Sequence, residues 1–209
     1  MKGDIRIDST WRGPSINIPP KVSELQGGLY VLQAEANSLD APGLTTVGGT
    51  CQSCTGGGNI VINGTKLNHV GFTELKTIIG DLVVAGNDNL RTINGFPQLG
   101  SIIGNIEIVG PIDTSSFPSL NNITQGINIQ SSSNNFTCPV SDFSTSNGGV
   151  AGQDFVCQGN IPNPKLARPV PTPTAMSVTT LVPVTNVPGS GASRMVSSGI
   201  FPLRSMNPN

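Results

Sequence analysis

The chain has 209 residues, of which 11% are charged and 4% are aromatic, and its formal net charge is −1. This composition excludes a basic surface for nucleic acid or for an anionic membrane, and it supplies few aromatic side chains for stacking on bases. We therefore expect no nucleic-acid partner. The length allows one domain of about 140 residues followed by a tail.

Residues 1–18 are expected to form an irregular leader. They begin without the apolar run of a secretory signal peptide, and they contain no complete copy of the repeat described below. Ile16 and Ile18 alternate with polar residues, as in the stub of a strand. For Trp11 two interpretations remain open: it covers the exposed end of the next domain, or it is a stray residue in a disordered segment.

A repeated pattern, F-x-x-L-x-x-I-x-G-x-[LI]-x-[VI] with a glycine that shifts by one residue, extends through residues 19–157. Three full copies begin at Phe72, Phe96 and Phe117, which are 24 and 21 residues apart. Self-similarity at such a period is the signature of a solenoid. The last apolar residues of each copy alternate with period 2, which predicts a short strand with one side in a core.

Two partial copies, at residues 22–31 and 42–49, precede the full ones, with Ala41 where phenylalanine is expected. One turn of such a repeat cannot bury its own apolar edge, so successive turns must stack. The sequence therefore predicts an all-β fold: a right-handed parallel β-solenoid with leucine-rich-repeat-like turns over residues 19–157, followed by a disordered tail.

An insertion, CQSCTGGGN, interrupts the repeat after Gly49, and we expect it to leave the solenoid as a loop. It contains Cys51 and Cys54 in a C-x-x-C spacing. A redox role requires a helix N-terminus that lowers the pKa of the first thiol, and zinc requires two further ligands. Neither is evident, since His69 is the only histidine. A local disulfide is favoured over free thiols, and both are favoured over a metal or redox site.

The first strand of each turn also carries side chains that alternate with the core positions and should point outward. These positions form one stripe, which consists of Tyr30, Val61, Val83, Glu107 and Asn128. The stripe is apolar at one end, where Tyr30, Val61 and Val83 make a candidate binding face. The alternative is a solvated sheet whose apolar residues reflect β-propensity alone.

Cys138 and Cys157 bracket a polar segment just after the last turn. We expect a disulfide between them that stabilises the end of the domain by a few kcal/mol. Residues 158–209 are rich in proline, serine and threonine and have no apolar period. Such a segment cannot bury enough apolar surface to fold. An O-glycosylated stalk and a plain disordered tail both fit this composition.

Asn63, Asn122 and Asn135 each begin an N-x-[ST] sequence for N-glycosylation. Three such sequences, together with an even number of cysteines, indicate a secreted protein. Glycoside hydrolysis normally needs two carboxylates about 5–9 Å apart, and no two acids align on adjacent strands of the predicted solenoid. We therefore predict that the protein is not an enzyme and has no cofactor or metal site.

The repeat and its trailing cysteines resemble the fungal GPI-anchored cell-wall-organisation proteins, which carry receptor-L-domain-like repeats. The resemblance covers residues 19–157 and is closest over residues 72–90, 96–99 and 126–138. It implies a non-enzymatic, glycosylated protein of the cell wall or the outer surface of the plasma membrane, which contributes to wall organisation and integrity. The alternative is an extracellular recognition module that binds a protein or a wall polysaccharide through the sheet face.

The same resemblance implies wall polysaccharide or other wall proteins as partners, and contact with the membrane only through a lipid anchor. The C-terminus lacks the apolar tail of about 10–20 residues that an anchor signal requires, and no signal peptide is visible. We therefore expect the chain to correspond to a C-terminal portion of such a protein.

Overall fold

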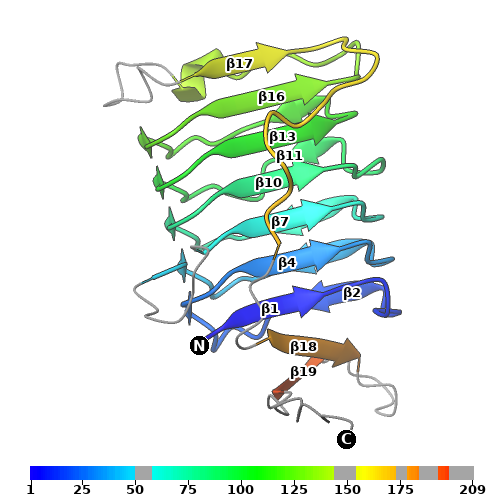
Figure 1. The fold of residues 1–209 in the computed structure, drawn as a ribbon, viewed down its shortest axis with the longest axis vertical. Helices are drawn as coiled ribbons and strands as arrows, with labels where there is room; N and C mark the ends of the chain where they lie inside the picture. Colours follow the sequence, from blue (N-terminus) through cyan, green and yellow to red (C-terminus); the bar gives the residue numbers. More distant parts are fainter. Residues whose placement is uncertain (50–57, 144–153, 173–177, 184–192, 198–209) are drawn as a thin grey trace, which may run out of the picture.

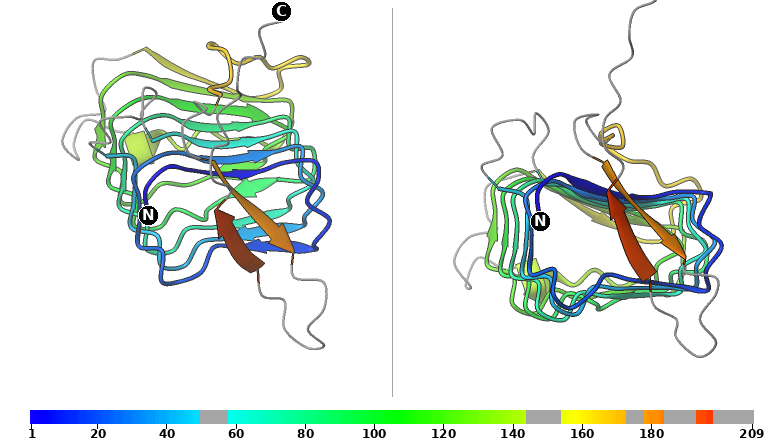
Figure 2. Two further views of the ribbon diagram at one scale, coloured as in Figure 1. Left: turned by 60° about the horizontal axis from the view of Figure 1, so that its bottom comes forward. Right: turned by 90° about the horizontal axis from the view of Figure 1, so that it is seen from below.

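The structure is a computed structural model that describes residues 1–49, 58–143, 154–172, 178–183 and 193–197. The chain winds into a parallel β-solenoid of about six turns, with almost no helix in the described residues. Seen end-on, the successive turns superimpose in one outline (Figure 2). The all-β, parallel solenoid that the repeat predicts is confirmed.

One face of the solenoid is a large sheet to which every turn contributes a strand (Figure 1). Its parallel strands are, in spatial order, β1 (Asp4–Ile7), β4 (Leu29–Leu32), β7 (Ile60–Asn63), β10 (Leu82–Ala85), β13 (Ile106–Gly110), β16 (Ile127–Ser131) and β17 (Phe155–Gln158). Consecutive strands of this sheet are thus separated by one whole turn of the chain. The period of the sequence pattern therefore equals the number of residues in one turn.

Shorter strands form the other two faces. The second face contains β2 (Ser15–Asn17), β5 (Ser38–Asp40) and β8 (His69–Gly71), with β11 (Thr92–Ile93) and β14 (Thr114–Ser115) paired separately. The third face contains β3 (Glu24–Leu25), β6 (Thr46–Val47), β9 (Thr77–Ile78), β12 (Ser101–Ile102) and β15 (Asn122–Ile123). A 3-10 helix, η1 (Val140–Phe143), follows β16.

The register of the large sheet stacks like residues inside the solenoid. Leu82 of β10 pairs with Ile60 on one side and Ile106 on the other, and all three are fully buried. Because each apolar side chain packs mainly against its equivalents in neighbouring turns, the core is a set of ladders that run along the solenoid axis.

A stack of phenylalanine rings forms one of these ladders. The ring centroids of Phe72 and Phe96 are 5.0 Å apart, and those of Phe96 and Phe117 are 5.8 Å apart. Beyond the last full copy, Phe143 of η1 lies 6.0 Å from Phe117 and Phe155 of β17 lies 5.9 Å from Phe143. The segment after the last repeat therefore continues the ladder and closes one end of the core.

Residues 1–18 correct the expectation of an irregular leader, because they form the first turn. β1 pairs in parallel with β4, and β2 pairs in parallel with β5. Ile5 and Ile7 are fully buried, so they occupy the same inward positions as the paired apolar residues of later turns. Trp11 is also buried, and its indole N–H donates a hydrogen bond to the carbonyl of Gly13 at 2.9 Å. The turn escaped detection because it lacks the F-x-x-L half of the repeat.

The disulfide predicted between Cys138 and Cys157 is confirmed. Their Cα atoms are 6.0 Å apart, within the usual range for a disulfide. The bond joins the segment after β16 to β17, the last parallel strand of the large sheet. Cys51 and Cys54 lie outside the described residues, so a disulfide between them stays a prediction.

The beginning of the tail is packed against the solenoid instead of being disordered. After β17, residues 159–172 run back along the outer side of the large sheet (Figure 1). Further on, β18 (Val178–Pro183) pairs in parallel with β1, and β19 (Ser193–Ser197) pairs with β18 in antiparallel fashion. The tail composition alone could not show this, since the surface that receives residues 159–172 is formed by other parts of the chain.

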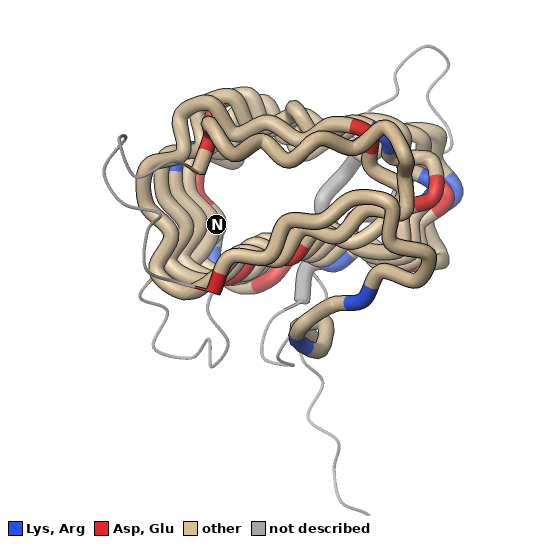
Figure 3. Tube along the Cα trace, turned by 90° about the horizontal axis from the view of Figure 1, so that it is seen from above, with Lys and Arg blue, Asp and Glu red and all other residues tan. Residues whose placement is uncertain are grey.

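Charged positions are few and of mixed sign around the turns (Figure 3). The exposed ion pairs include Glu35 with Lys66, whose charged atoms are 3.2 Å apart, and such pairs typically contribute little to stability. In the part of the chain that the structure describes, no helix is long and apolar enough to cross a membrane.

The phenylalanine stack leads to a first prediction. Phe96→Ala should lower the free energy of unfolding by about 3–5 kcal/mol, because the removed ring lies between two others in a core that cannot collapse onto it. Urea denaturation measures this loss. Phe155→Ala is the matched control: Phe155 is 46% exposed and lies at the end of the stack, so the loss should be clearly smaller. Equal losses would contradict a cooperative stack.

Asp4 leads to a second prediction. Its buried carboxylate accepts the N–H of Gly28 at 2.7 Å. Burial raises the pKa of Asp4 above its ordinary value of 3.8, and the Gly28 hydrogen bond opposes the rise without cancelling it. The raised pKa means that the folded state favours the protonated, neutral carboxyl. The resulting contribution to the free energy of unfolding is fully present below pH 3.8, and it is lost as the pH rises through the raised pKa.

Asp4→Asn keeps the acceptor oxygen but carries no charge. We therefore expect it to unfold at a higher temperature than the unsubstituted protein at pH 7, with the difference much reduced at pH 3, where Asp4 is protonated. Thermal unfolding at the two pH values measures both differences. A stability gain that is the same at pH 3 and pH 7 would show that the charge of Asp4 is not its cause.

Candidate functional site: the outer face of the large sheet

The outward stripe predicted from the sequence is a real structural feature, but it is not exposed. Its members lie on neighbouring strands in register, with Val61 opposite Tyr30 and Val83, and with Glu107 opposite Val83 and Asn128. All five side chains are buried. The stripe is covered by residues 165–172, which we call the strap (Figure 1). It is therefore neither a free binding face nor a solvated sheet.

The apolar half of the stripe forms a second small core outside the solenoid. Tyr30, Val61 and Val83 make a cluster separate from the main core, and Leu166 and Val170 of the strap pack against it. This burial raises the pKa of Tyr30, helped by the nearby carboxylates of Asp4 and Asp81, while a hydrogen bond with Asn59 lowers it. The three residues of the candidate binding face are thus already covered by apolar side chains of the same chain.

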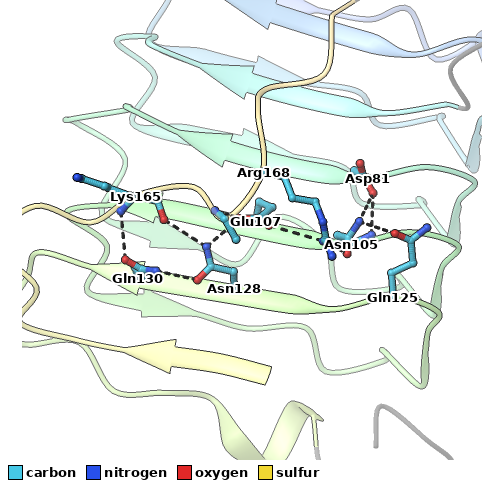
Figure 4. A network of polar contacts seen from close by, with 9 residues as sticks. Asp81, Asn105, Glu107, Gln125, Asn128, Gln130, Lys165 and Arg168 are labelled. Carbon is cyan, nitrogen blue, oxygen red and sulfur yellow. Dashed lines mark hydrogen bonds and ion pairs between the residues drawn. The ribbon is translucent and has the colours of Figure 1, made fainter. Parts of the chain in front are cut away.

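The polar half of the stripe is centred on Glu107, whose side chain is only 4% exposed (Figure 4). Its Oε2 accepts hydrogen bonds from Asn128 Nδ2 at 2.8 Å and from the backbone N–H of Ala167 at 3.1 Å. The guanidinium of Arg168 lies 3.8 Å from Oε1, and Oε1 has no hydrogen bond within the described residues. A buried carboxylate is costly unless it is paired and hydrogen-bonded, so the strap compensates much of the cost of placing Glu107 on this face.

The sheet also binds the backbone of the strap through amide side chains. Gln130 Oε1 accepts the N–H of Lys165 at 3.1 Å, and Asn128 Nδ2 donates to the carbonyl of Lys165 at 3.3 Å. Gln130 Nε2 in turn donates to Asn128 Oδ1 at 3.0 Å. These contacts fix the position of the strap before it reaches Glu107.

A ladder of polar side chains at the start of the strands positions the partner of Arg168. Asp81 N–H donates to Asn59 Oδ1 at 2.7 Å, and Asn105 N–H donates to Asp81 Oδ1 at 2.8 Å. Asn105 Nδ2 donates to Asp81 Oδ1 and to Gln125 Oε1, both at 2.9 Å. These bonds fix the amide nitrogen of Asn105, so its Oδ1 faces the guanidinium of Arg168. Arg168 donates a hydrogen bond to this oxygen (Figure 4).

The strap leaves a hollow on either side of its central contacts. One cavity of about 430 Å³ is bounded by β13, β16, β17 and the strap, and its lining includes Glu107, Asp154 and Arg168. Another of about 370 Å³ lies at the far end of the strap, where its lining includes Arg6, Asn63 and residues 170–172. The strap therefore does not cover the face evenly. Its attachment depends on the contacts that it makes between these two cavities.

The three sequons occupy different environments. Asn135 is exposed. Asn122 is half-buried, and its Nδ2 donates to Ser101 Oγ at 2.9 Å. Asn63 is half-buried at the end of β7, and the hydroxyl of Thr65 in its sequon is buried against Asn87 Oδ1 at 2.7 Å. Asn135 is therefore the most accessible of the three, and glycosylation itself stays a prediction.

His69 and Glu107, two residues considered for metal or acid–base chemistry, lie in different surroundings. Among the described residues, no group of three or more His, Cys, Asp or Glu side chains could hold a metal ion. His69 is exposed, and its Nε2 lies 3.4 Å from Asp40 Oδ1. On the stripe, Glu107 is neighboured in register by Val83 and Asn128 and not by a second acid.

Sequence reasoning missed the strap residues Lys165, Leu166, Arg168 and Val170. One signal was available: an acid, Glu107, stands in an otherwise uncharged stripe and requires a cation if that stripe is buried. The segment K-L-A-R-P-V offers one arginine between two apolar residues. On the solvated-sheet interpretation Glu107 needs no such partner, so that interpretation does not lead to the strap.

Comparison with known proteins finds relatives of one general kind. A cell surface GPI-anchored protein of Arthroderma benhamiae is 28% identical over 122 residues, which are 58% of this chain and 29% of that protein. Sporulation-specific protein 2 of Saccharomyces cerevisiae is 30% identical over 118 residues, 56% of this chain and 22% of the relative. Cell wall mannoprotein PST1 of the same yeast is 30% identical over 74 residues, 35% of this chain and 17% of the relative.

These relatives are fungal, and two of them are cell-surface or cell-wall proteins by name. The matched part of the chain spans less than a third of the length of each relative. No protein-family profile matches the chain, and no solved structure matches it significantly.

The strap leads to a third prediction. Glu107→Ala removes the acceptor of the Ala167 amide and the anion beside Arg168. We expect exchange of the Ala167 amide hydrogen with solvent to become at least about tenfold faster, because the strap then opens more often. Hydrogen exchange followed by NMR measures this amide directly.

Two further variants make that measurement specific. Glu107→Gln retains an acceptor oxygen and should give a smaller increase than Glu107→Ala. Glu35→Ala removes an exposed acid that pairs with Lys66 and should leave Ala167 exchange unchanged. If Ala167 is equally protected in all three variants, the hydrogen bond to Glu107 does not hold the strap.

Proposed function

We propose that this chain is the solenoid part of a non-enzymatic, glycosylated cell-surface protein that contributes to the organisation and integrity of a fungal cell wall. The observation that carries the proposal is the similarity, over more than half of the chain, to a GPI-anchored surface protein. A shorter match to a cell wall mannoprotein supports it. On this proposal the repeats are receptor-L-domain-like, and the protein resides in the wall or on the outer surface of the plasma membrane.

The architecture fits a structural role outside the cell. A solenoid stacked along one axis, with one end closed by the phenylalanine stack and a disulfide, supports the proposal of a structural spacer. Disulfides such as Cys138–Cys157 form and persist in oxidising compartments. Glycans at Asn122 and Asn135 would add polar bulk to the turns that carry them. The proposed partners are wall polysaccharide or other wall proteins.

Fractionation of cells that carry an epitope tag at the native gene tests the location. We expect the tagged product in the wall or membrane fraction, with a mobility on gels that increases after endoglycosidase treatment. A soluble cytosolic product whose mobility does not change would contradict the proposal. Cells that lack the gene should be more sensitive than the parent strain to wall-binding dyes, and normal growth on these dyes would count against the role in wall integrity.

The fourth prediction concerns which asparagine carries a glycan. Because Asn135 is the most exposed of the three, Asn135→Gln should remove one glycan and produce one downward step on a gel. Asn63→Gln should produce a smaller step or none, since its sequon is partly buried. Equal steps for the two variants would contradict this, because they would show that attachment does not depend on exposure in the folded protein. Comparison of both variants before and after endoglycosidase treatment distinguishes these results.

A further inference from the structure

The strap and the outer stripe are complementary surfaces carried by the same chain. We propose that they also bind between chains: the strap of one copy lies on the outer stripe of a second copy, so that neighbouring copies exchange straps. This inference concerns the interaction of two copies and does not depend on the proposed function. It rests on the contacts and the burial described above and on the short segment that connects the strap to the solenoid.

The contacts themselves do not require the strap and the stripe to belong to one chain. Arg168 bonds to Asn105 and lies beside Glu107, and the Ala167 amide bonds to Glu107. Leu166 and Val170 pack on the apolar cluster of the stripe. All of these are contacts between separate elements, so the same set forms when the strap comes from another copy, as in domain swapping.

The segment that connects the strap to the solenoid favours exchange. Ile161 is fixed by a hydrogen bond from its N–H to the Ser131 carbonyl at 2.9 Å, and Lys165 is fixed by Gln130. Between them lie residues 162–164, with the sequence Pro-Asn-Pro, where the chain bends. A proline restricts its own backbone, and it biases the preceding residue toward an extended conformation. Short hinges under such constraint favour swapped arrangements.

The length of the hinge limits how the two copies lie. The four steps from Ile161 to Lys165 span at most about 13–14 Å when extended. A straightened hinge therefore delivers the strap only to a copy whose large sheet lies directly beside the first. Copies that each give and receive a strap close into a symmetric pair, whereas copies that give in one direction form an open chain.

The chain's own strap competes with any strap from another copy. A short tether gives a local concentration of the order of millimolar, so the unsubstituted protein is expected to be monomeric in dilute solution. Exchange becomes measurable when one copy has a stripe that cannot hold its own strap and the other has a strap that cannot bind.

The fifth prediction uses two full-length variants of that kind. The donor, Val83→Asp, places a carboxylate in the apolar cluster against which Leu166 packs and next to Glu107 in register, so the cluster no longer holds its own strap, whose sequence is unchanged. The acceptor, Leu166→Ala with Arg168→Ala, has an intact stripe and a strap without its anchors. Light scattering with size-exclusion chromatography should show each variant alone as a monomer and their equimolar mixture as a heterodimer.

A third chain is the matched control. The acceptor that also carries Glu107→Ala should bind the donor at least about tenfold more weakly, because the buried partner of Arg168 is then missing. Thermal unfolding establishes that all variants remain folded, which is expected because their substitutions lie outside the main core. A mixture of folded donor and folded acceptor that stays monomeric at every concentration up to millimolar overturns the proposal.

A peptide measurement keeps the proposal testable if the donor does not fold. A fluorescent peptide of residues 161–172 should bind the full-length acceptor, and the same peptide with Arg168→Ala should bind at least about tenfold more weakly. Equal binding of the two peptides, or binding of neither, overturns the proposal, since the stripe then does not recognise the strap as a separate element.

Discussion

Each turn of this protein buries its apolar side chains only against the turns above and below it. That dependence on stacking determines the rest of the structure. It requires the strands of the large sheet to keep one register, because a shift by one residue would move every inward side chain to the outside. It also leaves two terminal turns that each lack a neighbour. At one end η1, β17 and the Cys138–Cys157 disulfide supply the missing cover, and at the other β18 pairs with the edge strand β1.

The large sheet is buried on both sides along the outer stripe. Its inner side faces the solenoid core, and its outer side faces the strap, so a run such as Leu82–Ala85 is buried throughout. Continuous apolar strands of this kind are typical of parallel sheets with both faces covered. Here the outer side is covered by a single extended segment, the strap. The attachment of the strap therefore depends on a small number of contacts with Glu107 and with the apolar cluster.

The repeat made most of the fold predictable, and its limits explain what was missed. Phe72, Phe96 and Phe117 set the phase, and from them the inward and outward positions of every central strand could be assigned. The first turn has isoleucines in the correct alternation but no phenylalanine, so the pattern was too short to distinguish it from a leader. The strap has no period at all. Its position follows from a pairing between Arg168 and Glu107, and a lone acid in the stripe indicates such a partner only once the stripe is known to be buried.

The strap is made after all the parallel turns that it covers, and this has a consequence for biosynthesis. During translation the turns form in order from the N-terminus, and Tyr30, Val61 and Val83 reach their positions long before residues 165–172 leave the ribosome. For that interval the nascent protein presents an apolar ribbon to its surroundings, next to the sequon at Asn63. Any chaperone that binds this ribbon must do so before closure, and the emergence of residues 165–172 determines when the ribbon is covered.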